Sequence, residues 1–245
     1  MKMTMFRSQF NILIAATLAV AGCAHAQAGK ELVFGTTHDE NSPLFLYASA
    51  YLQQLCAESR QRCTLQSLPG RRSEAMLAAG SIVGEVGRVK GYLQKHPDYV
   101  RLDEPFIVSR TRIFTRTDKD ITSWESLAKK VRTVSYKRGI YLYQQRLEAL
   151  QPAIQPHDVQ NEAACLQMVL VARDDACVFD DGGISNEARP LLAQGHSSAS
   201  VEDLPLYIYL GKDNAALAPV LSDAARRMAA RGLPAQLHHK FYEAK

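Results

Sequence analysis

The chain has 245 residues, of which 47% are hydrophobic and 22% are charged, and it contains five cysteines. This composition excludes a long disordered chain, a collagen, a coiled coil and a small disulfide-dense scaffold, and the length suits one large domain or two small lobes. The formal net charge of +4 is too small to indicate nucleic-acid binding, which concentrates positive charge on one face or tail.

The N-terminus has the pattern of a secretory signal peptide. Lys2 and Arg7 precede a short apolar stretch at residues 12–20, and small residues follow. The apolar stretch is about half the ~20 residues that a membrane-spanning helix needs. We therefore expect an exported protein without a mature transmembrane helix.

Two cleavage sites compete at the end of this leader. Ala24-His25-Ala26 fits a signal peptidase site and assigns residues 1–26 to the signal peptide. Val20-Ala21-Gly22-Cys23 also resembles a bacterial lipobox, which would end the leader at residue 22 and leave a lipidated Cys23. The first predicts a soluble periplasmic protein and the second a lipoprotein anchored to the membrane.

The four cysteines beyond the leader indicate disulfides, because an even number in an exported chain is typical of them. We predict the pairs Cys56–Cys63 and Cys165–Cys177, since each joins a predicted helix to the strand that follows it. Four buried free thiols are the alternative. No C-x2-C spacing or nearby histidine completes a zinc ligand set, so no metal site is expected.

Strand and helix patterns alternate along the rest of the chain. Residues 32–37 form the first strand pattern, and Asn41-Ser42-Pro43 then begins a helix with an apolar stripe up to Leu55. Further strands are predicted at residues 64–68, 82–86, 112–116, 131–136, 176–179 and 206–210. Further helices are predicted at residues 71–79, 140–150 and 162–171. A capping box at 122–125 predicts another short helix, and two more are predicted to begin at Leu217 and near Pro234.

This alternation predicts an α/β protein with mostly parallel sheets. The chain has too few units for an eight-fold barrel. Two small sheets joined by crossing segments near residues 109–116 and 201–207 fit the number of strands.

The order of several motifs resembles bacterial extracytoplasmic solute-binding proteins. The motifs are a helix–Gly–strand–acid step at residues 77–85, crossings at 104–107 with 112–116, a helix-to-strand step at 124–131 and a return at 203–213. The resemblance covers nearly all of residues 31–245 and is nearest to the polar amino-acid-type proteins (family 3). It implies a type 2 periplasmic binding protein fold, with two Rossmann-like lobes of mixed, mostly parallel sheets and a two-segment hinge. Lobe 1 would be residues 30–110 plus 206–245, and lobe 2 residues 111–205.

The resemblance also implies a function. Such a protein captures a small polar solute, an amino acid or a related organic ion, in the cleft between its lobes. It then docks on an ABC-type membrane permease complex. We accordingly expect a monomer with no cofactor, no nucleic-acid partner and no catalytic residues. The family's Thr-x-x-Arg stretch is missing, and Arg88 follows the acid Glu85 by only three residues, so the chain resembles an atypical short branch.

Ligands of doubly wound α/β lobes bind beyond the carboxyl ends of the strands, which selects particular loops. The ligand-binding candidates in these loops are Asp39, Asn41, Arg72, Arg88, Tyr136, Arg138 and Asp180. Asn41 is also a candidate helix cap, Arg72 a surface residue, and Tyr136 a core residue. Arg88 can instead form a structural ion pair with Glu85, and Asp180 can belong to a turn.

Two other functions fit the same pattern. One is an enzyme on the same fold, resembling the dehydratases among its relatives, for which Glu85 or Asp39 would be a cleft acid with a raised pKa. The other is an accessory lipoprotein that senses a solute and supplies no transporter.

Overall fold

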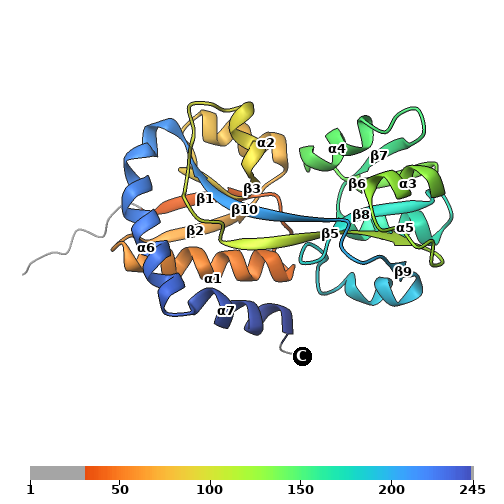
Figure 1. The fold of residues 1–245 in the computed structure, drawn as a ribbon. Helices are drawn as coiled ribbons and strands as arrows, with labels where there is room; N and C mark the ends of the chain where they lie inside the picture. The colour runs from red at the N-terminus through yellow and green to blue at the C-terminus, as the bar shows by residue number, and fades with distance from the viewer. Residues whose placement is uncertain (1–30, 244–245) are drawn as a thin grey trace, which may run out of the picture.

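The computed structural model describes residues 31–243 and has two lobes bridged by a pair of long strands (Figure 1). The predicted signal peptide, both cleavage sites and Cys23 lie outside the described residues. None of the helices between residues 31 and 243 has the length and hydrophobicity that a bilayer crossing needs.

Lobe 1 is built on three parallel strands, in which β1 lies between β2 and β3. The strands are β1 (Leu32–Thr36), β2 (Cys63–Ser67) and β3 (Gly84–Val89). The helices are α1 (Pro43–Glu58), α2 (Gly70–Ala78), α6 (Ala218–Ala230) and α7 (Leu233–His238). Short segments complete it: η1 (Lys90–Gln94), β4 (Val100–Arg101), η3 (Lys212–Leu217) and the π-helix η4 (His239–Glu243).

Lobe 2 repeats the arrangement with β6 between β7 and β8, again in parallel pairs. The strands are β6 (Thr133–Lys137), β7 (Gln155–Val159) and β8 (Ala176–Asp180). The helices are α3 (Trp124–Lys130), α4 (Tyr141–Glu148) and α5 (Glu162–Leu170), with η2 (Arg189–Gln194) and the short β9 (His196–Ser197).

Two long antiparallel strands, β5 (Ile107–Thr115) and β10 (Glu202–Leu210), run through both lobes (Figure 1). β10 pairs with β3 and β5 pairs with β8, so the order is β2-β1-β3-β10-β5-β8-β6-β7 in one mixed sheet. The two small parallel sheets of the prediction are thus joined by the crossing strands into one continuous mixed sheet. Each crossing strand begins several residues earlier than its apolar pattern, because exposed polar residues such as Arg110 and Asp203 occupy the link.

The cores of the two lobes are separate. The core of lobe 1 joins the predicted stripe of α1, from Leu44 to Leu55, to buried residues of β10 and α6 such as Leu210 and Leu221. Burying each such side chain contributes roughly 1.5–3 kcal/mol. Lobe 2 has one cluster on each face of its sheet, around Val134 and around Phe179 respectively.

Both predicted disulfides are present. Cys56–Cys63 ties the end of α1 to β2 with its Cα atoms 5.9 Å apart, and Cys165–Cys177 ties α5 to β8 at 5.5 Å. Each lobe therefore has one bridge between a helix and the strand that follows it.

The start of α3 differs from the prediction by one residue. Ser123, not Thr122, is the N-cap: its Oγ accepts the Ser126 N–H, and Ser126 Oγ accepts the Ser123 N–H. The box thus uses two serines rather than Glu125. This register directs the Trp124 indole N–H at Glu202 Oε2 (2.9 Å), which anchors α3 to β10.

One strand was not predicted, and the predicted lobe boundaries remain a prediction. Strand β7 was missed because its sequence is polar and contains Pro156, which an edge strand tolerates. The predicted lobe boundaries at 110/111 and 205/206 fall inside β5 and β10 and stay a prediction.

Candidate functional site

A cavity of about 960 Å3 lies between the two lobes. Lobe 1 lines it with the loops that follow β1 and β2, and lobe 2 with the loops that follow β6 and β7. All four loops leave the carboxyl ends of parallel strands, which is where doubly wound sheets hold their ligands. We call this cavity the cleft.

The two lobes are joined across the cleft by a buried ion pair. Lys137, the last residue of β6, has its Nζ 2.8 Å from Asp39 Oδ1 of lobe 1 and 2.9 Å from Glu162 Oε2 of lobe 2. Burial raises the pKa of Glu162 to about 8, although the nearby ammonium of Lys137 acts to lower it. Burial opposes the charge on Lys137, but the two carboxylates hold its pKa above the usual value. The ammonium of Lys137 thus connects one acid from each lobe.

Arg88 is engaged by Glu85, as the alternative interpretation stated. Its Nε donates to Glu85 Oε2 (3.0 Å) and its terminal nitrogen to Oε1 (2.8 Å), and both side chains are buried. Residues three apart in a regular strand point to opposite faces. Here Gly87 has a φ of 95° and β3 has a register shift against β10, which brings both side chains to one side. Burial alone would raise the pKa of Glu85, but Arg88 outweighs it and holds that pKa below its usual value.

Three predicted ligand residues line the cleft: Asp39, Tyr136 and Arg138. Tyr136 is largely buried, and Arg138 pairs with Asp158, its Nε lying 2.5 Å from Oδ2. A fourth, Asp180, lines a second cavity between the lobes, and its Oδ1 accepts the Gly182 N–H at 2.8 Å. Burial raises the pKa of Asp180 to about 7.

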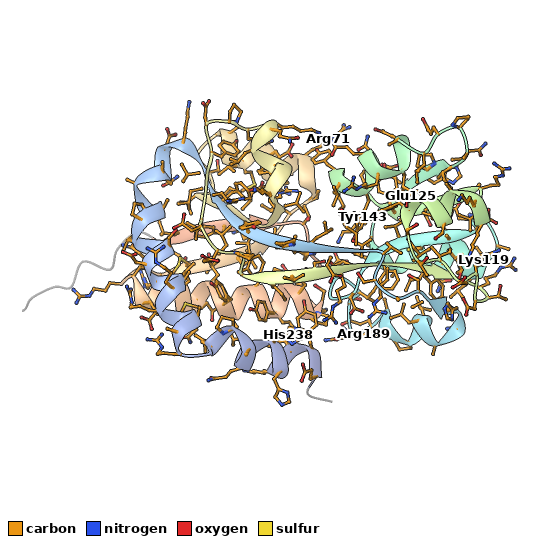
Figure 2. The ribbon with its side chains drawn as sticks, in the orientation of Figure 1. Arg71, Lys119, Glu125, Tyr143, Arg189 and His238 are labelled. Carbon is orange, nitrogen blue, oxygen red and sulfur yellow. A yellow bond between two sulfur atoms is a disulfide. The ribbon has the colours of Figure 1, made fainter. Side chains whose placement is uncertain are left out.

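Asn41 and Arg72 are not among the residues that line the cleft. Asn41 donates to Glu187 Oε1 (2.9 Å) of lobe 2 outside the cavity, and the neighbouring Ser42 caps α1. Arg71 and Arg72 are both exposed, but only Arg71 is among the residues that line the cleft. Figure 2 shows Arg71 on the side of lobe 1 that faces lobe 2. Consecutive helical residues differ by about 100° in direction, so only one of the two arginines can face the cleft.

A second, smaller cavity of about 80 Å3 lies between the lobes beside the crossing strands, and we call it the inner cavity. Its lining includes Ser109, Leu204 and Leu206 of the crossing strands and the first turn of α4. Its remaining lining includes His38, Gly87, Arg88 and Asp180. Ser109 and Glu162 were not predicted: Ser109 precedes the apolar pattern of its strand, and Glu162 is an ordinary residue for a first helical turn.

No group of three or more His, Cys, Asp or Glu side chains that could hold an ion occurs between residues 31 and 243.

Comparison with known proteins agrees with this architecture. No family model matches the chain. An uncharacterised protein of Shewanella oneidensis is 29% identical over 195 residues, which are 77% of this chain and 73% of that protein. Among solved structures, an ancestral arginine-binding protein bound to arginine superposes with a TM-score of 0.72 at 15% identity, covering 88% of this chain and all of that one.

Two further structures give the same result. An ancestral amino acid-binding protein, a precursor of cyclohexadienyl dehydratase, has a TM-score of 0.68 at 18% identity, over 87% of this chain and 95% of its own. A Salmonella typhimurium periplasmic binding protein with high arginine specificity has a TM-score of 0.67 at 17% identity, over 86% and 98%. The fold is that of the type 2 periplasmic binding proteins. The predicted fold class is thereby confirmed.

Proposed function

We propose that this protein is a periplasmic binding protein that captures a small polar solute, an amino acid or a related organic ion, between its lobes. The observation that carries the proposal is the cleft, whose charged and aromatic lining comes from both lobes and from the carboxyl ends of their strands. The leader-like N-terminus and the two disulfides support a location outside the cytoplasm.

The cleft offers groups for both charges of such a solute. The guanidinium of Arg71 has no hydrogen-bond or ion-pair partner among residues 31–243 and is the group for a carboxylate. Asp39 is about one-third exposed and is the group for an ammonium, in exchange for part of its contact with Lys137. Tyr136 and Tyr141 supply aromatic surface. A solute that contacts both lobes binds the closed form better and so shifts the open–closed equilibrium toward it.

The experiment is a thermal-shift screen of the mature protein with amino acids, small organic acids and amines, followed by calorimetry on each hit. A solute at a hundred times its Kd stabilises by about 2.7 kcal/mol. We expect Arg71→Ala to weaken binding at least tenfold and Arg72→Ala, at the neighbouring residue outside the cleft lining, to leave it unchanged. If no solute shifts the melting temperature at saturating concentration, the proposal fails.

We propose binding without catalysis. The enzyme alternative needs a cleft acid with a raised pKa, and Glu85, one of its two candidates, has a lowered pKa because of Arg88. Asp180 has a raised pKa and is the acid that such an enzyme would use, so recovery of the solute decides between the two functions. A hit incubated with the protein should be recovered unchanged, as judged by NMR.

Delivery to an ABC-type permease is part of the same proposal. Permease and ATPase genes beside the coding gene would support it. If binding is confirmed and no such genes are present, the alternative of a solute sensor takes its place.

A further inference from the structure

We propose that the inner cavity is a specificity subsite for an uncharged, hydrogen-bonding end of the solute, such as a hydroxyl or carboxamide, with His38 and Ser109 as its recognition groups. The inference rests on the proposed function and deepens it by naming the class of solute. The ionic groups of the solute would remain in the cleft, and its neutral end would extend inward.

The inner cavity is placed to receive one end of a solute held in the cleft. Thr37 and Tyr141 line both cavities, so the two adjoin. The inner cavity is less than a tenth as large and accommodates only a group of a few heavy atoms. Leu204, Leu206 and Ile140 give it apolar surface for a carbon chain.

Three side chains in its lining have buried polar atoms without a hydrogen-bond partner among residues 31–243. They are His38, at both Nδ1 and Nε2, Ser109 at Oγ, and Tyr92 at its hydroxyl. His38 is 6% exposed and Ser109 is 5% exposed. A buried polar atom without a partner costs about 1–3 kcal/mol, so a bound group that pairs with His38 and Ser109 recovers part of that loss.

The position of His38 is fixed by its surroundings. Its carbonyl oxygen accepts the Ser67 hydroxyl at 2.8 Å. A Cβ on Gly87 would lie 3.0 Å from Nε2, so the imidazole packs directly on the backbone of β3. The ring is therefore held between Gly87 and the inner cavity, which it also lines.

The charges around the inner cavity favour a neutral guest. Burial, reinforced by Lys137 and Arg88, lowers the pKa of His38 to about 3, so its imidazole is neutral and has one donor and one acceptor. Burial raises the pKa of Asp180 to about 7. Burial thus shifts both a base and an acid toward their uncharged forms. A charged group of the solute would be disfavoured by the same loss of water.

The nearby cations are already paired, which further disfavours an anion. Arg88 is held by Glu85, and Lys137 by Asp39 and Glu162. A hydroxyl or amide needs no counter-ion and can use the donor and acceptor of His38 together with the Ser109 hydroxyl.

The test is calorimetric binding of two series of amino acids. One series is L-glutamine, L-glutamate and L-methionine, which are close in size, and the other is the isosteric pair L-citrulline and L-arginine with the shorter L-norleucine as the apolar member. We expect the uncharged polar member to bind most tightly in at least one series, with at least a tenfold lower Kd than the other members, or about 1.4 kcal/mol. Ser109→Ala and His38→Leu should then reduce its affinity to that of the apolar member, whereas Ser81→Ala, in an exposed loop, should change nothing.

The outcomes separate the two proposals. If glutamate or arginine binds most tightly of all, or if both variants keep the tenfold preference, the subsite is refuted and the proposed function stands. If no member of either series binds and the wider solute screen is also negative, the proposed function fails and the subsite fails with it. If members bind without a preference for the uncharged polar one, only the subsite fails. Ser109→Ala removes one oxygen atom and keeps the test decisive if His38→Leu does not fold.

Discussion

Gly70 and Gly139 meet across the cleft with no side chain between them. A Cβ on Gly70 would lie 3.1 Å from both the Cα and the carbonyl oxygen of Gly139. Gly70 is the first residue of α2, and Gly139 has a φ of 90° just before α4. The backbones of the two lobes therefore touch at the edge of the cleft, and the absence of a methyl group there permits the closed arrangement.

We expect Gly70→Ala to hold the lobes apart without unfolding the protein. Alanine favours a helix over glycine by up to about 1 kcal/mol, so stability should stay level or rise, while solute affinity falls. Small-angle X-ray scattering should show a larger radius of gyration in the presence of solute. Gly91→Ala is the control, because no atom lies within 4 Å of its added Cβ. Unchanged affinity and unchanged scattering would show that the contact does not limit closure.

Replacing Lys137 by methionine should destabilise the protein strongly. The change removes the buried ammonium that pairs with Asp39 and contacts Glu162, and breaking a buried pair typically costs about 3–5 kcal/mol. Urea denaturation measures the loss. Lys130→Met, which breaks the exposed pair with Asp120, should have little effect. Equal effects of the two variants would mean that Lys137 contributes no more than a surface charge.

Stability should fall as the pH rises from about 6.5 to 8. The folded protein keeps a proton on Glu162 up to about pH 8 and on Asp180 up to about pH 7, whereas the unfolded chain releases both near pH 4. His38 acts in the opposite direction, but only below pH 6.5, where the unfolded chain binds a proton that the folded form excludes.

The free energy of unfolding from denaturant titrations at several pH values checks this dependence. Glu162→Gln should flatten the fall toward pH 8, and Asp180→Asn should flatten its lower part. A free energy of unfolding that rises across this window in the wild-type protein would contradict the prediction.

Each disulfide should contribute about 2–3 kcal/mol, because both close short loops. The bridged residues are 7 positions apart in Cys56–Cys63 and 12 apart in Cys165–Cys177. We expect Cys165→Ala/Cys177→Ala to lose slightly more than Cys56→Ala/Cys63→Ala in guanidinium denaturation. The wild-type protein should lose the combined amount when it is unfolded in reductant. No loss in either double variant would contradict the loop-closure estimate.

Much of the fold could be predicted from the sequence because local patterns determine it. The stripe of α1 from Leu44 to Leu55 and the apolar strand β8 belong to elements that are buried on one or both faces. The crossing strands and β7 could not be predicted fully, since their exposed residues follow no apolar period. Pairing with neighbouring strands, which is a long-range property, specifies them instead.

The loops of the candidate site were easier to predict than its side chains. Asp39 and Arg138 lie in the cleft because their loops follow parallel strands. Arg72 does not, because the start of α2 at Gly70 directs Arg71 toward the cleft instead. The pairing of Arg88 with Glu85 depends on the unusual backbone of Gly87, and a strand pattern contains no sign of it.

The order of the chain through the crossing strands has a consequence for how the protein folds during synthesis. The core of lobe 1 combines residues near the start, such as Phe34, with Leu221 and Met228 of α6. The clusters of lobe 2 lie within one continuous stretch, with their buried residues between Ile113 and Ala188. A chain that emerges N-terminus first can therefore complete lobe 2 while lobe 1 still lacks α6. The apolar residues of β1 and α1 should accordingly stay exposed longest during synthesis, and chaperones that bind apolar surface should bind there.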